Sequence, residues 1–294
     1  MPTVVLAERA FVSVSGPDAE HLLQSIITTD LSALPEGVAK PGALLTPQGK
    51  ILFDFLIGRA GPDGFVLECR SEIADDLMRR LMLYKLRARV QISKRDESLA
   101  AVSWGADSAS SRSDSTTSGT DSTALRDARF PQELGVTRRP VDAVEADADV
   151  SAWTSLRIDH GVAESGSDYA LSDAFPHDVL YDQNGGVGLR KGCYVGQEVV
   201  SRMHHRGTAR RRVLIAEAGA DLPPAGTPLL AQGRPAGTLG TVLGSRGLAL
   251  VRIDKVKAAM DTGEPVTAGD VRLSLSIPPG MGFGFPETST GEDA

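Results

Sequence analysis

The feature that most restricts the fold is a series of short β-like runs that fills the sequence from about residue 206 onward. Glycine and proline separate the runs, and these residues end strands and form tight turns. Several short strands at close intervals are typical of all-β architectures. This part of the chain therefore predicts a small antiparallel barrel or sandwich, built from the runs RVLIAEA, GTPLLA, GTLGTVLG, GLALVRI and VRLSLSI.

The first hundred residues mix helices with strands. Residues 11–15 alternate as a half-buried strand does, and residues 43–57 predict two strands joined by a turn at Pro47–Gly49. The segment that opens with Pro17, which suits a first helical position, and residues 71–86 carry apolar residues at helical spacing. Two helices that alternate with several strands predict an α+β, ferredoxin-like layout.

Composition divides the remainder of the chain. Residues 103–127 include a serine-rich stretch that cannot bury enough apolar surface to offset the entropy of ordering. We expect a disordered insert there, between an N-terminal α+β lobe at 1–102 and a second α+β lobe at 128–205. The predicted barrel then covers 206–280, and an acidic tail covers 281–294.

Composition also excludes several classes of protein. The 294 residues are 41% apolar, which allows a sizeable core, and the net charge of -7 argues against non-specific coating of nucleic acid or membrane. The first residues lack the pattern of a secretory signal, and no run approaches the roughly 18 apolar residues of a transmembrane helix. With only two cysteines, a disulfide framework is not expected. We therefore predict a soluble cytoplasmic protein with no membrane partner.

The stretch LRKGCYVGQEVVSRMHHRG concentrates the residues that could carry chemistry. Gly192 and Gly196 let the backbone turn sharply on either side of Cys193. Two basic residues, Arg190 and Lys191, come just before them, and a short helix could begin after Gly196. Positive charge and a helix start lower the pKa of a nearby thiol and make it more reactive. This pattern favours a functional thiol at Cys193.

Two other interpretations of Cys193 stay open beside the reactive thiol. Free cysteine is often a small, inert hydrophobe, a description that suits Cys69 in its apolar strand. Cys193 could also bind a metal, but His204 and His205 would point to opposite faces of a strand and leave no closed ligand set. We therefore predict no metal bound by this chain alone.

Basic residues are unusually dense around this stretch. Residues 190–212 contain seven Lys and Arg against one acid, in a chain that is acidic as a whole. This concentration favours an anionic ligand, such as a small molecule with carboxylates. RNA recognition would also need interleaved aromatic residues, and Tyr194 is the only one here. We therefore expect no direct nucleic-acid binding.

These residues also resemble the signature of a known family. The octapeptide KGCYVGQE resembles that of the YgfZ family of folate-binding proteins, which includes mitochondrial relatives that act in iron–sulfur cluster assembly. Further segments that resemble this family cover most of residues 10–255; they are VSVSGPDAEHLLQSIITTDL, LLTPQGKILFDFLI, WTSLRIDHG and GTLGTVLGSRGLALVRID.

The resemblance implies a fold shared with the glycine-cleavage aminomethyltransferase, with α+β lobes around a folate site and a C-terminal antiparallel β-barrel. It implies tetrahydrofolate, or a folate derivative, as the cofactor. It also implies a supporting role in the assembly or repair of iron–sulfur enzymes, including tRNA-modifying ones. The implied partners are iron–sulfur proteins or their assembly factors.

The resemblance further assigns roles to single residues. The lysine and cysteine of the motif are Lys191 and Cys193, which it implies are the catalytic residues. A flat indole can stack on a pterin ring, which suits a tryptophan in the folate site. The implied folate contacts are Trp153, Asp54, Arg157 and Tyr194. Without the resemblance, Trp153 would be a core anchor and Asp54 a surface acid.

Two departures from the family pattern bear on an alternative function. A second folate-contacting tryptophan of bacterial members falls near Arg9, and the chain has no clear GYTGE-type segment, a folate-site element of the aminomethyltransferases. Asp54, however, occupies the position of the aspartate that those enzymes require. The alternative is a folate-dependent one-carbon (aminomethyl) transferase, which the missing segment disfavours.

Overall fold

The chain folds into two compact units that interleave along the sequence. The computed structural model describes residues 1–105, 124–143, 146–207 and 209–287. Unit 1 comprises Met1–Val150 and Asn184–Gln197, and unit 2 comprises Ser151–Gln183 and Glu198–Ala294. Most of the predicted serine-rich insert, and the end of the predicted acidic tail, lie outside the described residues. The predicted domain boundaries stay a prediction.

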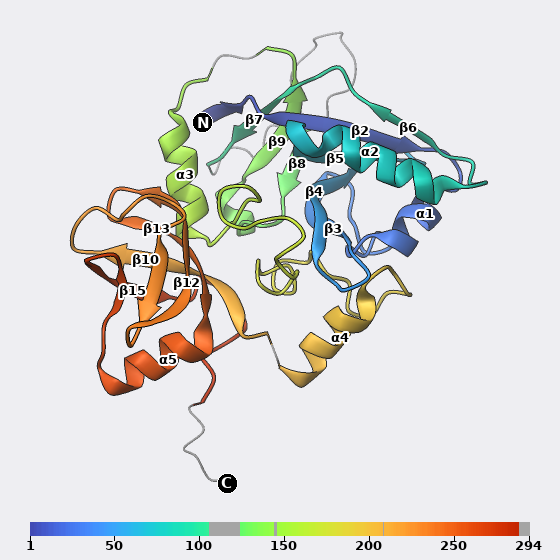
Figure 1. Ribbon diagram of the computed structural model, residues 1–294. Coiled ribbons are helices and arrows are strands. Elements are labelled where there is room, and N and C mark those ends of the chain that lie inside the picture. The colour runs from blue at the N-terminus through green and yellow to red at the C-terminus, as the bar shows by residue number, and fades with distance from the viewer. Residues whose placement is uncertain (106–123, 144–145, 208, 288–294) are drawn as a thin grey trace. The chain divides into compact units, whose positions relative to one another are not determined.

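Unit 1 is built on one β-sheet of nine described strands (Figure 1). Neighbouring strands run antiparallel, except that β3 and β8 are parallel. Their order across the sheet is β1-β7-β9-β8-β3-β4-β5-β2-β6. The strands are β1 Thr3–Leu6, β2 Arg9–Ser15, β3 Val38–Leu45, β4 Ile51–Arg59, β5 Gly64–Arg70, β6 Gln91–Lys94, β7 Leu99–Ser103, β8 Leu125–Asp127 and β9 Thr137–Val141.

The hairpin of β3 and β4 forms where the sequence predicts it. The two strands pair antiparallel along most of their length, and the Pro47–Gly49 turn joins them. Gly49 has a φ of 81°, a conformation that glycine adopts without steric cost. The N–H of Gly49 donates a hydrogen bond of 2.9 Å to the carbonyl oxygen of Thr46, which closes the turn.

Two amphipathic helices pack on this sheet. α1 (Ala19–Ile26) contacts β5 and α2, and α2 (Ser71–Lys85) contacts β2, β5 and β6. The prediction that Pro17 begins the first helix is wrong by two residues. The carboxylate of Asp18, at the N-cap, accepts hydrogen bonds from the backbone and side chain of Arg89 instead of capping α1. A short 3-10 helix, η2 (Gln132–Leu134), precedes β9.

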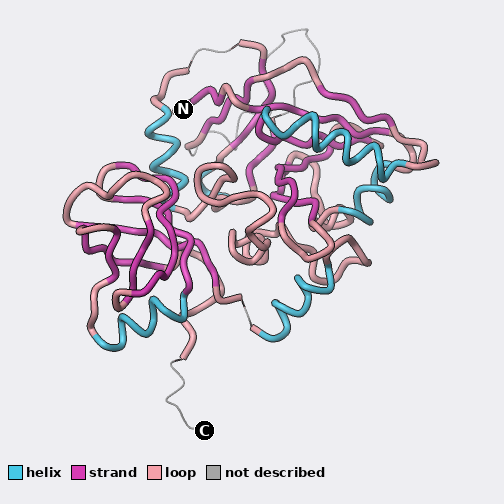
Figure 2. Tube along the Cα trace, in the orientation of Figure 1, coloured by secondary structure: helices cyan, strands magenta, loops and turns pink. Residues whose placement is uncertain are grey.

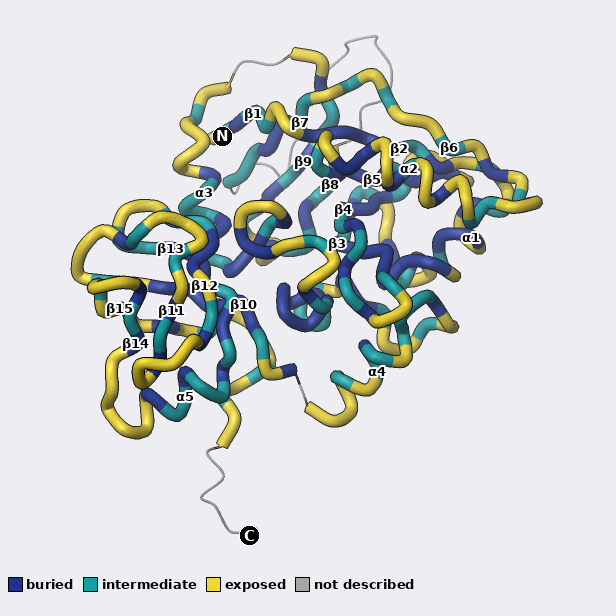
Figure 3. Tube along the Cα trace, viewed as in Figure 1, coloured by how far each residue is buried: buried dark blue, intermediate teal, exposed yellow. Residues whose placement is uncertain are grey.

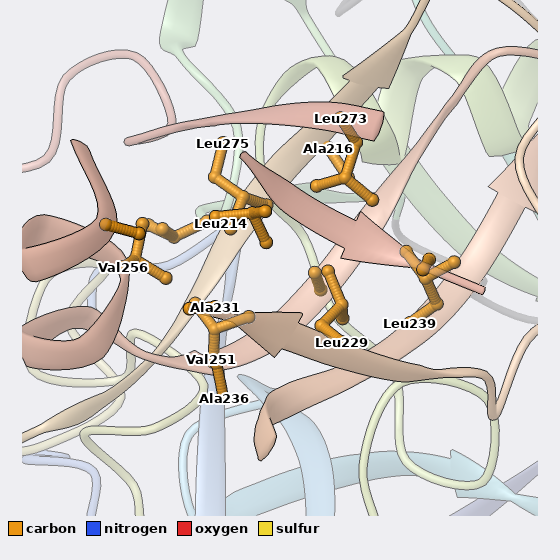
Figure 4. Packing of buried hydrophobic residues seen from close by; sticks show 14 of the residues in the cluster. Leu214, Ala216, Leu229, Ala231, Ala236, Leu239, Val251, Val256, Leu273 and Leu275 are labelled. Atoms are coloured by element: carbon orange, nitrogen blue, oxygen red, sulfur yellow. The ribbon is translucent and has the colours of Figure 1, made fainter. Parts of the chain in front are cut away.

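Unit 2 contains a closed antiparallel barrel, which excludes the sandwich alternative (Figure 2). The strand order around it is β10-β13-β12-β11-β14-β15. The strands are β10 Arg211–Ala218, β11 Pro228–Ala231, β12 Arg234–Leu243, β13 Arg246–Arg252, β14 Val266–Ala268 and β15 Val271–Ser276. Apolar side chains from alternate positions fill the barrel, and Val256 of α5 (Ile253–Thr262) joins them (Figure 4).

Two more helices complete the described structure. α3 (Val150–Asp159) forms from the predicted WTSLRIDHG region, and α4 (Gln197–Arg206) begins directly after Gly196, as predicted. His204 and His205 lie in the last turn of α4, so the strand geometry used to argue against a metal site does not apply to them. Basic side chains near a helix C-terminus interact favourably with the helix dipole, which explains why the helix continues through them. The α+β unit and the antiparallel barrel confirm the predicted fold class.

Candidate functional site

The loop that carries the KGCYVGQE motif is fixed to the body of unit 1 at its start. The hydroxyl of Thr28 donates a hydrogen bond of 2.6 Å to the carbonyl oxygen of Gly186. The N–H of Gly188 donates one of 2.8 Å to the carbonyl oxygen of Thr28. Thr28 follows the C-cap of α1 and exchanges hydrogen bonds with Ala43 near the end of β3, so the ends of that helix and of that strand support the loop.

Lys191 makes the next attachment. Its ammonium group donates hydrogen bonds of 2.8 Å to the carbonyl oxygen of Ile27 and 2.9 Å to that of Thr29. Ile27 is the C-cap residue of α1, so the lysine satisfies carbonyl groups at a helix end that has no further helical partners. Burial lowers the pKa of Lys191 to about 8, although the nearby carboxylate of Asp30 opposes the shift.

The aromatic ring of Tyr194 also contacts this lysine. The ammonium nitrogen of Lys191 lies 5.2 Å from the centre of the ring, within the range of a cation–π contact. Tyr194 is buried, and its burial raises the pKa of the phenol to about 12. The tyrosine therefore packs within unit 1, and its predicted contact with folate stays a prediction.

Two glycines on either side of Cys193 have different roles. Gly196 has a φ of 78°, and a Cβ atom there would lie 2.6 Å from the carbonyl oxygen of Thr46. Only glycine fits this close approach to the β3–β4 turn without strain. Gly192 is open, with nothing within 4 Å of the position of a Cβ atom. The loop is thus held at Lys191 and at Gly196, and the residues between them include the exposed Cys193.

The second cysteine occupies the opposite environment. Cys69 lies in β5 and is buried, with 1% of its surface exposed. Burial raises the pKa of its thiol to about 12. The prediction that Cys69 is buried and Cys193 accessible is confirmed, and their difference in reactivity stays a prediction.

The implied folate residues do not all lie in the same unit. Trp153 and Arg157 are one helical turn apart on α3 in unit 2, and both are buried. The guanidinium of Arg157 donates hydrogen bonds to the carboxylate of Asp168 at 3.1 Å and to the hydroxyl of Thr241 at 3.1 Å. Asp54 lies in unit 1, half-buried on β4. Their joint role in one folate site stays a prediction.

Unit 1 contains a cavity of about 290 Å³ on the sheet face that Leu56 of β4 occupies. Asp54 is two residues from Leu56, so its side chain points to the same face. Part of the cavity wall is apolar, and part is formed by arginines of β9 and of the segment after β6. Its wall includes Phe11, Leu56, Val66, Leu125, Arg95, Arg138 and Arg139.

A buried network of charges borders this cavity. Glu68 of β5 accepts hydrogen bonds from Arg9 at 2.8 Å and from Arg138 at 2.9 Å. Burial alone would raise the pKa of Glu68, but the guanidinium groups of Arg138 and Arg9 outweigh it and hold the pKa at about 2. Asp127 binds Arg129 at 2.6 Å and lies 3.7 Å from Arg138. Arg9, near which the resemblance places a second tryptophan of bacterial members, is therefore part of this network.

Sequence patterns alone did not identify this network. Its members come from β2, β5, β8 and β9. Bonded partners lie up to 70 residues apart along the chain, as Glu68 and Arg138 do. The one available signal was a charge inside an apolar strand, as at Glu68 in GFVLECR. Because buried charges are almost always paired, such a position indicates a partner without identifying it.

Two of the seven basic residues for which the sequence predicted an anionic ligand, Arg211 and Arg212, instead form ion pairs with acids of unit 2. Arg212 binds Asp182 at 2.6 Å, and Arg211 binds Asp173 at 2.9 Å and Asp178 at 3.0 Å. The acids lie about 30 to 40 residues earlier in the chain, outside the window in which the charges were compared. Among the described residues, no group of three or more His, Cys, Asp or Glu side chains is placed to hold a metal ion.

Comparison with protein families identifies two domains. Residues 8–124 match the GCVT N-terminal domain, and residues 210–283 match the C-terminal β-barrel domain of CAF17. The fold is similar to a crystal structure of glycine cleavage system aminomethyltransferase T from Bartonella henselae, with a TM-score of 0.71. That similarity covers 95% of this chain and 85% of the other at 16% sequence identity, so it concerns the fold alone. The fold and its domains define a protein of the aminomethyltransferase-like class.

Its homologues within that class are iron–sulfur cluster assembly factors. The chain is 35% identical to the mitochondrial IBA57 homolog of Pyricularia oryzae, over 71% of this chain and 55% of the relative. It is 29% identical to IBA57 of Mus musculus, over 86% and 78% of the two chains, and 28% identical to IBA57 of Homo sapiens, over 92% and 82%. The chain thus spans just over half the length of the fungal relative.

The names of these relatives correct the predicted location and support the family resemblance only at a more general level. The mitochondrial homologues contradict the predicted cytoplasmic location and point to a mitochondrial one. The sequence argument failed because excluding a secretory signal and a membrane span does not separate cytoplasm from the mitochondrial interior. The resemblance to the YgfZ family is confirmed at the level of iron–sulfur assembly factors with GCVT and CAF17 domains, and these relatives are named IBA57.

Proposed function

We propose that this chain supports the assembly or repair of iron–sulfur proteins and that Cys193 is its functional thiol. The observation that carries the proposal is the exposed Cys193 on a loop that Lys191 and Gly196 fix to unit 1. A thiol held away from the core by a fixed loop can reach a partner without rearrangement of the fold. The names of the homologues support the same role. The partners are iron–sulfur proteins, including tRNA-modifying enzymes, or their assembly factors.

We further propose tetrahydrofolate, or a folate derivative, as the cofactor. The aminomethyltransferase-like fold supports this proposal, and so does the composition of the unit 1 cavity. Phe11, Leu56 and Val66 offer an apolar surface for a flat ring, and Arg139 offers a guanidinium for a carboxylate. Bound folate would supply one-carbon chemistry, while the residues of this chain bind and orient it.

A folate-dependent aminomethyl transferase is the second candidate. Asp54 on the cavity-facing side of β4 favours it, because a carboxylate there could hold an amine of the folate. That activity needs a folate, an amine donor and an acid, but no thiol. The two functions therefore differ in whether Cys193 is required.

The first experiment tests the assembly role in cells depleted of their own IBA57. Expression of the full chain in mitochondria should restore the activities of iron–sulfur enzymes, while enzymes without a cluster stay unchanged. Failure of a well-expressed chain to restore any of them would contradict the proposed function.

The second experiment tests folate binding by calorimetry with tetrahydrofolate. Trp153→Phe and Arg139→Gln should each weaken saturable binding, because one removes part of the indole and the other a guanidinium. Trp104→Phe is the matched control, since Trp104 is the only other tryptophan and is not among the implied folate contacts. Absence of binding by the unmodified chain would contradict the folate proposal and leave the assembly proposal standing.

A further inference from the structure

The turn that joins α2 to β6 exposes an unusual cluster of large apolar side chains. Met82, Leu83 and Leu86 are 45%, 69% and 88% exposed. Single exposed apolar residues are common on protein surfaces, but three within five positions form a local cluster. Figure 3 shows this end of α2 and the turn that follows it as a projecting edge of unit 1 with much exposed chain.

The same segment is strongly basic. Residues 77–95 contain seven Lys and Arg and no acid, in a chain of net charge -7. Four of these cations have carboxylate partners, namely Arg79, Arg89, Lys94 and Arg95. Within the described part of the chain, no ion pair involves Arg80, Lys85 or Arg87, which alternate with the exposed apolar residues. An anionic partner would therefore meet both charge and apolar surface here.

We propose that this basic apolar turn, residues 80–87, is a contact site for an anionic lipid bilayer. Leucines at a projecting tip can enter the boundary between headgroups and acyl chains, while the flanking arginines and lysine meet the lipid phosphates. RNA fits less well, because sequence-tolerant RNA binding depends on aromatic stacking and the large exposed apolar side chains here, Met82, Leu83 and Leu86, are not aromatic. The site lies in unit 1 and is separate from the proposed thiol loop in sequence.

A surface contact of this kind needs no membrane-spanning segment. No helix in the described residues is long and apolar enough to cross a membrane. The prediction of no membrane partner rested on the lack of such a segment and on the net charge of -7, and a net charge does not exclude a local basic site. A peripheral contact depends on only a few exposed side chains and on lipid charge, so that argument does not address it.

The test is co-sedimentation of the full chain with vesicles. Vesicles with equal molar amounts of phosphatidylcholine and phosphatidylglycerol should bind the chain. Vesicles of phosphatidylcholine alone should bind it with a partition coefficient at least about tenfold lower. Binding to the anionic vesicles should fall as the salt concentration rises, because salt screens the contacts with lipid phosphates.

Two variants separate the apolar and the charged contributions. Leu83→Asn with Leu86→Asn should lower the partition coefficient between anionic vesicles and water at least about tenfold. The reason is that both apolar side chains that would enter the lipid boundary are removed. Arg80→Gln with Arg87→Gln should lower it roughly thirty-fold. Matched controls at exposed barrel positions, Leu243→Asn and the pair Arg234→Gln with Arg272→Gln, should bind as the unmodified chain does.

Three outcomes would overturn the proposal. The first is absence of binding to the anionic vesicles. The second is equal loss of binding in the control variants, which would indicate a general charge effect. The third is binding to single-stranded RNA that the leucine variant leaves intact, together with no binding to vesicles.

Discussion

At the residue scale, the two cysteines of the chain show how one side-chain type takes opposite roles. Cys69 lies within an apolar strand of the sheet, and Cys193 lies on an exposed loop between two glycines. Local sequence was sufficient to predict both positions, because an apolar strand buries its residues and a glycine-rich polar segment exposes them.

We predict that iodoacetamide labels Cys193 at least about tenfold faster than Cys69 in the folded protein at pH 7.5. The attacking species is the thiolate, and burial raises the pKa of Cys69 to about 12, which leaves almost none of it ionised. Peptide mapping by mass spectrometry measures both rates in one sample. Equal rates in the folded state would contradict the assigned environments.

Lys191 was predicted from the family resemblance to be a catalytic residue, and its contacts favour a positioning role. Its ammonium group bonds to Ile27 and Thr29, about 160 residues earlier in the chain. No local pattern contains a contact of that separation, so the sequence could single out Lys191 but not its partners.

We predict that Lys191→Met destabilises the fold by about 1–3 kcal/mol, because two carbonyl groups lose their donor in a partly buried place. It should also change the rate at which Cys193 reacts, since the loop loses one attachment. Arg190→Met is the matched control, because Arg190 is exposed and should tolerate the change. Denaturant unfolding and thiol labelling measure the two effects. A Lys191→Met protein that matches the control in both would show that the attachment is unimportant.

His177 in unit 2 is a buried titratable group that sequence patterns did not indicate. It is 1% exposed, and neither ring nitrogen has a hydrogen-bond partner in the described structure. Burial lowers its pKa to about 4, and the charges of Asp182 and Arg212 act in opposite directions on it. The ring of His204 lies 6.3 Å away, between centroids.

We predict that His177 makes the fold less stable as the pH falls from about 6.5 to about 4. In this window the unfolded histidine binds a proton and the folded one does not, so acid favours unfolding by up to about tenfold per pH unit. His177→Leu should remove this dependence and be no less stable at pH 7.5. The pKa of neighbouring Asp178, raised by burial to about 6, has the opposite effect on stability. The effect of Asp178 is present in both the unmodified chain and His177→Leu, so it cancels when their stabilities are subtracted. A pH-independent difference in melting temperature would refute the prediction.

At the scale of elements, the hydrophobic pattern located the strands and helices well. The β3–β4 hairpin, α2 and the strands of the barrel follow directly from alternation, helical spacing and turn residues. Helix ends were less certain. α1 begins at Ala19, two residues later than Pro17 predicted, and α4 continues through His204 to Arg206.

The two glycines of the motif loop give a matched test at this scale. We predict that Gly196→Ala destabilises unit 1 by about 1–3 kcal/mol, because its positive φ and the carbonyl of Thr46 leave no place for a Cβ atom. Gly192→Ala should change stability by less than about 0.5 kcal/mol, since that position is open. Thermal unfolding compares the two. Similar losses in both variants would contradict the description of the loop.

At the scale of the whole molecule, the sequence predicted the α+β and barrel architecture. It did not predict which segments of the chain belong to each unit. The segment Asn184–Gln197 returns to unit 1 after more than thirty residues in unit 2. This return depends on hydrogen bonds to Thr28, Ile27 and Thr29, which no composition change or turn signal marks. The family resemblance supplied the candidate residues, and the structure supplied their contacts and showed the buried Arg9–Glu68–Arg138 network.

The central claim is that this chain supports iron–sulfur proteins through the thiol of Cys193. The most direct test compares Cys193→Ala with Cys69→Ala in cells depleted of their own IBA57, with protein levels matched by immunoblot. We predict that Cys69→Ala restores the activities of iron–sulfur enzymes as the unmodified chain does. We predict that Cys193→Ala folds and accumulates normally, because the residue is exposed, yet restores little or no activity. Full restoration by Cys193→Ala would contradict the claim and show that the exposed thiol has no part in the function.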